Sequence, residues 1–166
     1  MNNKKLLDLL HILKMKPEDV SDSTINDNED VIISTNFNNR LRLQKVVYII
    51  ANKTHDFDYP FSMYLRGPYS KELAKDYYNL IEEDIAESQE TMSDDGKKLA
   101  EKLEVKEVLW LEIASTYLMF LTSKSKDYAT KRTKEFKEDV LKANSKDSNY
   151  VDNVINEMSR LGIISN

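Results

Sequence analysis

A single Gly-Pro pair constrains the fold of this chain more than any other feature of its sequence. Only three glycines and three prolines occur in 166 residues, and Gly67 and Pro68 stand side by side within YLRGPYSKELAKDYYNL. Gly67 can adopt backbone angles that other residues avoid, and Ser70 can cap a following helix. The residues before the pair alternate between apolar and polar, which predicts a strand–turn–helix corner with Gly67, Pro68 and Ser70 at the turn. The expected apolar face of the strand is Phe61, Met63 and Leu65.

The first 53 residues predict two helices separated by an acidic loop or insertion. Leucines at helical spacing form one face of the first helix, which Pro17 ends. Residues 17–35 carry six acidic residues and no basic one, and we expect a loop with a short extended piece at Val31–Ile33. The asparagines at 36–39 are candidate N-caps of a second helix, RLRLQKVVYIIANK. The expected buried residues of the two helices are Leu6, Leu9, Leu10, Leu13, Leu43, Val46, Val47 and Ile50.

The chain after the corner is predicted to be mostly helical. An extended segment near Glu87–Met92 follows the helix that Ser70 opens, and Ser93 caps the next helix. The most apolar stretch, KEVLWLEIASTYLMFLTSK, predicts a central helix, followed by one helix over YATKRTKEFKEDVLKA and a last helix that Gly162 closes. The fold class is therefore mainly α with a small β element (α+β). Inward positions before the central helix are Leu73, Tyr77, Leu80, Ile81, Leu99, Leu103 and Val105.

Composition limits the compartment and the class of partner. The length suits a single domain over residues 1–166, with a core at 36–105 and a C-terminal helical part at 106–166. The absence of cysteine excludes disulfides and thiolate metal sites. No apolar run reaches the roughly 18 residues of a membrane-spanning helix, and the basic start lacks a signal-peptide cleavage site, so we expect a cytoplasmic protein. A net charge of −5 argues against a general nucleic-acid binder.

The central part of the chain resembles a known family. RLQKVVYII, FDYPFSMYLRGPYSKELAKDYYNL and TMSDDGKKLAEKLE, in this order and spacing, resemble the Panacea (SocA-like antitoxin) domain and the YwgA-like prokaryotic and phage proteins beside it. The resemblance covers residues 40–105: Gln44 and Lys45 match the Leu-Gln-Lys motif, Tyr64 and Gly67–Tyr69 match the Gly-Pro corner, and Gly96 matches the second glycine. It implies a winged-helix-like core and regulation by binding rather than catalysis. The 17–35 segment departs from the family pattern.

Candidate sites for catalysis are few. His55, Asp56 and Asp58 lie within four residues, but a zinc or general-base site needs a second histidine, and His11 is the only other one. Ser70 has neither a Gly-x-Ser-x-Gly frame nor an evident partner base, so we interpret it as a helix cap. We therefore expect no enzymatic activity, no metal and no cofactor.

Nucleic-acid binding is the alternative hypothesis. In a winged-helix-like core, Ser70–Leu80 would be the reading helix, with Lys71 and Lys75 toward phosphates. The stretch KSKDYATKRTKEFK, including Lys131–Lys134, is richer in basic residues. Lysine and glutamate at helical spacing, however, usually form a solvated, salt-bridged face.

Protein binding explains the tyrosines near the corner better. Six tyrosines lie between Tyr48 and Tyr78, and we assign about half of them to the core. Arg66, close to Tyr64 and Tyr69, is the best candidate hot spot. We predict a small protein-binding module, antitoxin-like or an accessory factor of a phage or defence locus, that masks a partner protein such as a toxin. The expected partner-binding residues are Arg42, Lys45, Tyr64, Arg66, Tyr69 and Lys71.

The acidic 17–35 segment has two interpretations. It is a solvated loop, as its composition favours, or a docking segment for a basic partner.

Overall fold

The computed structural model describes residues 3–21, 29–86 and 88–165. Within these ranges the chain is mainly helical with one small antiparallel sheet, as the sequence predicts. The elements in order are α1 (Asn3–Ile12), η1 (Pro17–Val20), α2 (Glu29–Lys53), β1 (Ser62–Tyr64), β2 (Gly67–Tyr69), α3 (Lys71–Tyr78), η2 (Glu82–Asp84), α4 (Asp94–Glu104), α5 (Val108–Leu121), α6 (Lys126–Phe136), α7 (Glu138–Ala143) and α8 (Asn149–Arg160).

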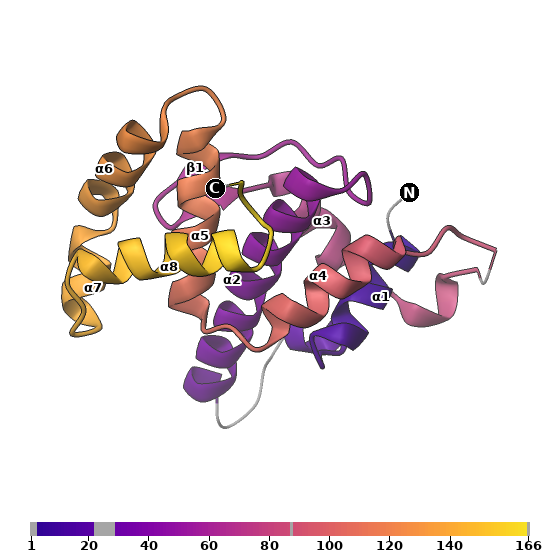
Figure 1. Cartoon of the computed structure of the whole chain (residues 1–166). Coiled ribbons are helices and arrows are strands. Elements are labelled where there is room, and N and C mark those ends of the chain that lie inside the picture. Colours follow the sequence, from indigo (N-terminus) through magenta and orange to yellow (C-terminus); the bar gives the residue numbers. More distant parts are fainter. Residues whose placement is uncertain (1–2, 22–28, 87, 166) are drawn as a thin grey trace.

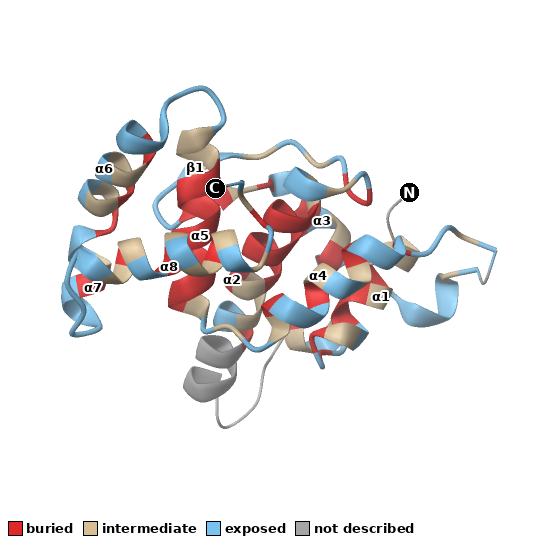
Figure 2. Ribbon diagram, viewed as in Figure 1, coloured by how far each residue is buried: buried red, intermediate tan, exposed pale blue. Residues whose placement is uncertain are grey.

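Helices α2 and α5 form the centre of the molecule (Figure 1). Ten consecutive residues of α5, Leu109–Leu118, are buried, which confirms the predicted central helix, since a helix buried on all sides must lie in the core. Helices α1 and α4 pack together beside α2, and α6 and α8 pack on α5. Figure 2 shows the buried residues concentrated in α2 and α5, with exposed residues on the outer faces of α6, α7 and α8.

The Gly-Pro corner is a β-hairpin, and the predicted position of the turn is wrong. Gly67 and Pro68 lie in β2, which pairs with β1 in the register Ser62–Tyr69, Met63–Pro68 and Tyr64–Gly67. The chain reverses at Leu65 and Arg66, where Leu65 is 97% exposed instead of facing inward. Ser70 follows the hairpin and caps α3, because its Oγ accepts a hydrogen bond from the Leu73 N–H at 3.2 Å, as predicted.

The second helix begins earlier than the sequence indicates. Helix α2 starts at Glu29, so the prediction of an extended piece at Val31–Ile33 is wrong. The acidic segment contains η1 and the first turns of α2. Residues 22–28 of that segment lie outside the described residues. Asn36 is not an N-cap: it lies inside α2 and donates to the carbonyls of Glu18 and Ser21. The Asn36 side chain therefore makes a tertiary contact instead of capping a helix.

Several smaller expectations are also corrected. Helix α1 ends at Ile12, since Lys14 adopts a positive φ of 60°, and Pro17 starts η1 instead of ending α1. Residues 88–92 contain no strand. Val105 is 75% exposed and Ile81 is 55% exposed, so neither points inward.

The predicted helix over residues 128–143 is two helices. It breaks at Lys137 between α6 and α7, where the Lys137 side chain is buried. The predicted cap Ser93 is confirmed. Gly162, predicted as the C-cap of the last helix, instead follows the C-cap Leu161 and has a positive φ of 76°. No helix in the described ranges combines the length and apolar character needed to cross a bilayer.

Candidate functional site: the hairpin pocket

One face of α2 supplies the base of the candidate site. Five residues at spacings of three and four lie on the same side of this helix and line one pocket: Phe37, Arg40, Leu41, Gln44 and Lys45. Residues with this spacing form a continuous stripe along a helix. The stripe mixes apolar, amide and cationic side chains, unlike the purely apolar positions that α2 turns to the core.

Two neighbouring residues of this stripe hold the hairpin on α2. Gln44 Nε2 donates to the Ser70 carbonyl at 2.9 Å, and the Ser70 N–H donates to Gln44 Oε1 at 2.9 Å. Lys45 Nζ donates to the Pro68 carbonyl at 2.7 Å. Residues 68 and 70 turn the backbone groups of β2 outward, because in an antiparallel pair alternate residues bond to the partner strand. The Gln-Lys pair of α2 therefore acts in place of a third strand.

The same geometry explains the proline in β2. Pro68 faces Met63 next to the pair that closes a two-residue turn, a position where no ladder hydrogen bond is made. The missing N–H of Pro68 therefore costs nothing within the sheet. Its free carbonyl becomes the acceptor for Lys45.

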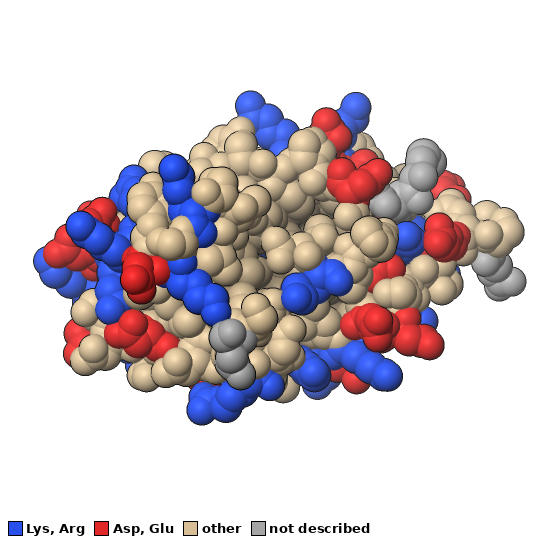
Figure 3. All heavy atoms as spheres, turned by 45° about the horizontal axis from the view of Figure 1, so that its top comes forward, with Lys and Arg blue, Asp and Glu red and all other residues tan. Residues whose placement is uncertain are grey.

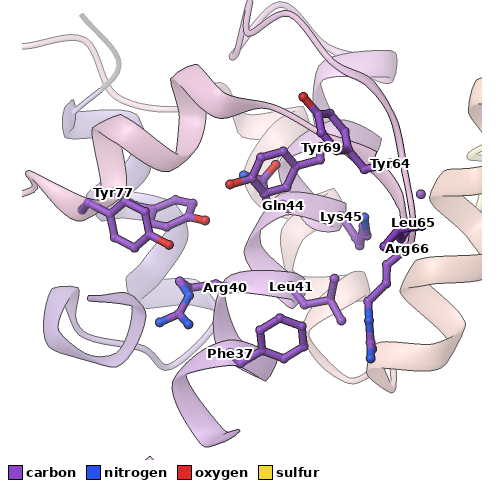
Figure 4. Close-up of a pocket in the computed structure, with 12 residues that line it drawn as sticks. Phe37, Arg40, Leu41, Gln44, Lys45, Tyr64, Leu65, Arg66, Tyr69 and Tyr77 are labelled. Atoms are coloured by element: carbon purple, nitrogen blue, oxygen red, sulfur yellow. The ribbon is translucent and has the colours of Figure 1, made fainter. Parts of the chain in front are cut away.

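The hairpin and α3 complete a pocket of about 480 Å³ above the α2 stripe, the hairpin pocket (Figure 4). Its remaining lining residues are Tyr64, Leu65, Arg66, Gly67, Tyr69, Tyr77 and Tyr78. The rings of Tyr64 and Tyr69 meet edge to face at 5.1 Å, and those of Tyr77 and Tyr78 do so at 4.8 Å. Aromatic pairs of this kind give rigid walls with polar hydroxyl tips.

Cationic side chains flank these aromatic walls. The Arg40 guanidinium lies 5.9 Å from the Tyr78 ring and donates to the Ser21 carbonyl at 2.9 Å. The Arg66 guanidinium lies 5.2 Å from the Phe37 ring. Figure 4 shows Arg40 and Arg66 on opposite sides, with Phe37 and Leu41 between them. Among the described lining residues, three are cationic and none is acidic.

A charge cluster of three buried side chains, Lys45, Glu112 and Lys137, and the half-exposed Arg66 lies beneath the hairpin. Glu112 Oε1 is 3.6 Å from Lys137 Nζ and 3.9 Å from an Arg66 nitrogen, and Lys137 Nζ also donates to the Arg66 carbonyl. Glu112, Lys45 and Lys137 are each less than 4% exposed. The cluster thus contains three cationic groups and one carboxylate.

Burial shifts the proton equilibria of both buried lysines. Desolvation, followed by the positive charge of Lys137, lowers the pKa of Lys45 to about 7, while Glu112 opposes the shift. Desolvation also lowers the pKa of Lys137, which Glu112 partly offsets. Lys45 therefore changes its charge near neutral pH, at the edge of the pocket.

The hairpin tip separates this pocket from a second hollow. Residues Tyr64, Leu65 and Arg66 line both, and the second hollow, of about 710 Å³, also borders Glu112, Lys137 and the start of α7. The exposed Leu65 therefore tops a ridge between two concave surfaces. In Figure 3 the middle of one face carries few charged atoms, and charged side chains gather toward its edges.

Four of the six predicted partner-binding residues meet at the hairpin pocket, namely Lys45, Tyr64, Arg66 and Tyr69. Arg42 does not line it: its guanidinium donates to the carbonyls of Lys106 at 2.7 Å and Glu104 at 3.4 Å, which anchors the end of α4. Lys71 is exposed in the first turn of α3, outside the lining.

The histidine and carboxylates considered for metal binding have another arrangement. Asp56 is 5% exposed and accepts hydrogen bonds from the Ser93 N–H and Ser93 Oγ, each at 2.7 Å. Its carboxylate thus supports the N-terminus of α4. No group of three or more histidine or acidic side chains in the described ranges could hold a metal ion.

Three of the six basic residues in KSKDYATKRTKEFK form ion pairs. Lys134 contacts Asp152 at 2.9 Å, Arg132 contacts Glu135 at 3.6 Å, and Lys137 belongs to the charge cluster. Blue and red atoms are mixed at the edge formed by α6 and α7 in Figure 3. This agrees with the predicted salt-bridged face.

Several contributors to the site were missed from the sequence, among them Phe37, Arg40 and Glu112. Phe37 and Arg40 precede the motif residues on the same helical face, and that spacing is a usable signal. Glu112 carried a clearer one, because it is the only charged residue within VLWLEIASTYLMFL. A lone acid in the most apolar helix predicts a buried partner of opposite charge.

No family model, curated protein or solved structure matches this chain. The resemblance of residues 40–105 to the Panacea domain therefore stays a prediction from the sequence.

Proposed function

We propose that this chain is a small non-enzymatic protein-binding module that acts in the cytoplasm by masking a partner protein. In agreement with the resemblance, it would be antitoxin-like or an accessory protein of a phage or defence locus. The partner would dock on the hairpin tip and insert a segment into the hairpin pocket.

The observation that carries the proposal is the combination of an exposed apolar tip with a rigid aromatic pocket. Leu65 is 97% exposed on a tight turn, where a large apolar side chain gains nothing from folding. Tyrosine and arginine, which line the adjacent pocket, are the residues most enriched among binding hot spots. Leu65 contributes nothing to the core, whereas the pocket walls are held rigid by it, since Tyr77 is a core residue and Tyr69 packs against the core.

The test is co-purification of the tagged protein from its native host, washed at low and at high salt. We expect one stoichiometric protein that survives high salt, because an aromatic interface depends little on ionic strength. The double variant Tyr64→Ala/Arg66→Ala should lose it. A matched control is Tyr128→Ala/Arg132→Ala, since Tyr64 and Tyr128 are 42% and 43% exposed. Equal recovery with both double variants would contradict the proposal.

A winged-helix-type DNA-binding regulator is the second candidate. It is favoured by the two exposed lysines of α3, Lys71 and Lys75. The exposed Glu72 between them opposes phosphate binding. Recovery of DNA that high salt removes, without a protein partner, would favour this candidate. Absence of DNA binding at low salt would exclude it.

A further inference from the structure

The hairpin pocket has a charge opposite to that of the whole protein. The chain has a net charge of −5, whereas the described pocket lining contains Arg40, Lys45 and Arg66 and no acidic residue. A pocket with only positive side chains selects an anionic occupant, since like charges repel and opposite charges attract most strongly where water is excluded.

The three cations are not equally available to a ligand. Arg40 already donates to the Ser21 carbonyl, and Arg66 faces Glu112. Lys45 is 1% exposed, and within the described part of the chain its ammonium group donates one hydrogen bond, to the Pro68 carbonyl. An ammonium group has three N–H donors, so Lys45 retains donor capacity at the pocket.

The charge cluster beneath the hairpin also lacks negative charge. Glu112 is the one carboxylate in the cluster and is shared between Lys137 and Arg66. An additional anion next to Lys45 would neutralise the excess. A single negative charge is sufficient for the one lysine that retains donors, whereas a phosphate dianion would need more free donors.

We propose that the occupant of the hairpin pocket presents a carboxylate to Lys45 and an adjacent apolar or aromatic side chain to the tyrosine walls. This inference rests on the proposed function and specifies the chemistry of the captured segment. The carboxylate is the C-terminus of the partner, because a C-terminal apolar residue carries its carboxylate and its side chain on the same Cα and so presents both groups together.

The position of Lys45 makes the binding of a carboxylate depend on pH. Burial, Lys137 and Arg66 keep Lys45 partly neutral above pH 7, with Glu112 as the opposing group. A bound carboxylate favours the charged form of Lys45. Binding at pH 8 must therefore take up protons, and affinity must fall as the pH rises from 7 to 9.

The experiment is isothermal titration calorimetry with three short peptides and the full chain. The first is N-acetyl-Leu-Phe with a free carboxylate, the second is its C-terminal amide, and the third is N-acetyl-Leu-Glu-Phe amide. We expect the amide and the Glu peptide to bind at least about tenfold more weakly than the free acid. Tighter binding of the Glu peptide than of the free acid would place the carboxylate on a side chain and overturn the assignment to the C-terminus. Titration at pH 8 in two buffers of different ionisation enthalpy should show proton uptake.

The comparison among peptides uses the unaltered protein, so it does not depend on whether a variant folds. Lys45→Met should abolish the preference for the acid, and Lys71→Met, on the exposed surface of α3, should retain it. Equal binding of acid and amide, tighter binding of phenyl phosphate, or no binding of any peptide would overturn the carboxylate proposal. A partner captured through Tyr64 and Arg66 in the co-purification test would still support the proposed function, so the two failures are distinguishable.

Discussion

Gly67 should be highly sensitive to substitution, because two costs combine there. Its φ of +107° is strained for any residue with a side chain, and a Cβ at this position would lie 2.5 Å from Thr116 Oγ1 of α5. Strained backbone conformations cost on the order of 1–3 kcal/mol, and overpacking in a core costs about 1–3 kcal/mol. After a gain of roughly 0.5–1 kcal/mol from restricting the unfolded chain, Gly67→Ala should lower the free energy of unfolding by about 3 kcal/mol.

Substitution of Gly162 measures the backbone cost alone, because Gly162 also has a positive φ but has no neighbour that an added Cβ would overlap. Its φ is +76°, but nothing lies within 4 Å of an added Cβ. Gly162→Ala should therefore cost only about 1 kcal/mol, the left-handed backbone penalty less the unfolded-state gain. Conversely, Thr116→Ala removes the overlapping oxygen, so Gly67→Ala in that background should cost about 1–2 kcal/mol.

Urea denaturation followed by the fluorescence of the single, buried Trp110 measures the free energy of unfolding of the wild type and of the four variants. The slopes with denaturant should agree, so that midpoints report stability alone. A cost for Gly67→Ala below about 0.5 kcal/mol would refute the assigned backbone strain. An unchanged cost in the Thr116→Ala background would refute the contact between the hairpin and α5.

Three further predictions concern the charged residues. Between the lowered pKa of Lys45, about 7, and the ordinary lysine pKa, the unfolded chain binds more protons than the folded one. The free energy of unfolding should therefore rise between pH 7.5 and 9.5, by at most about 1.4 kcal/mol per pH unit per group. Lys45→Met should flatten this slope in urea titrations. Glu112→Gln leaves Lys137 buried without its carboxylate and should lower the free energy of unfolding by about 3–5 kcal/mol. Glu135→Gln, in an exposed pair, should lower it by less than about 1 kcal/mol. Similar urea midpoints for the two variants would contradict the buried ion pair of Glu112 and Lys137. Arg42→Ala should lower stability by about 1–3 kcal/mol through lost bonds to the end of α4, yet leave peptide binding in the hairpin pocket unchanged; weakened binding in the calorimeter would place Arg42 in the site after all.

Periodicity was sufficient to predict the helical core. Leu6, Leu9 and Leu10 in α1 and the mostly apolar sequence of α5 follow from residue spacing, since burial of an amphipathic or apolar face decides where such helices lie. The caps at Ser70 and Ser93 follow from local hydrogen bonding within four residues. Local chemistry of this kind is readable from a single sequence.

The features that could not be predicted from the sequence depend on polar contacts between residues far apart in the chain. Asn36 is of a residue type that favours N-caps, but its side chain donates hydrogen bonds to carbonyls 15 and 18 residues away. Gly67 and Pro68 suggest a turn, but Gln44 and Lys45 form hydrogen bonds with the backbone along the outer edge of β2, as a neighbouring strand would. The break at Lys137 likewise depends on Glu112, which lies on another helix. Four residues of the site were predicted because their types suit an interface, whereas their shared pocket depends on these distant contacts.

Site-specific photocrosslinking at Leu65 tests the central claim most directly. A benzoylphenylalanine at position 65 on the hairpin tip is compared, in the native host, with one at position 105 at the end of α4, since Leu65 and Val105 are both exposed apolar residues, at 97% and 75%. If the hairpin tip docks a partner protein, position 65 gives one dominant protein adduct that position 105 does not. No adduct at position 65, the same products at both positions, or crosslinks to DNA alone would contradict the account.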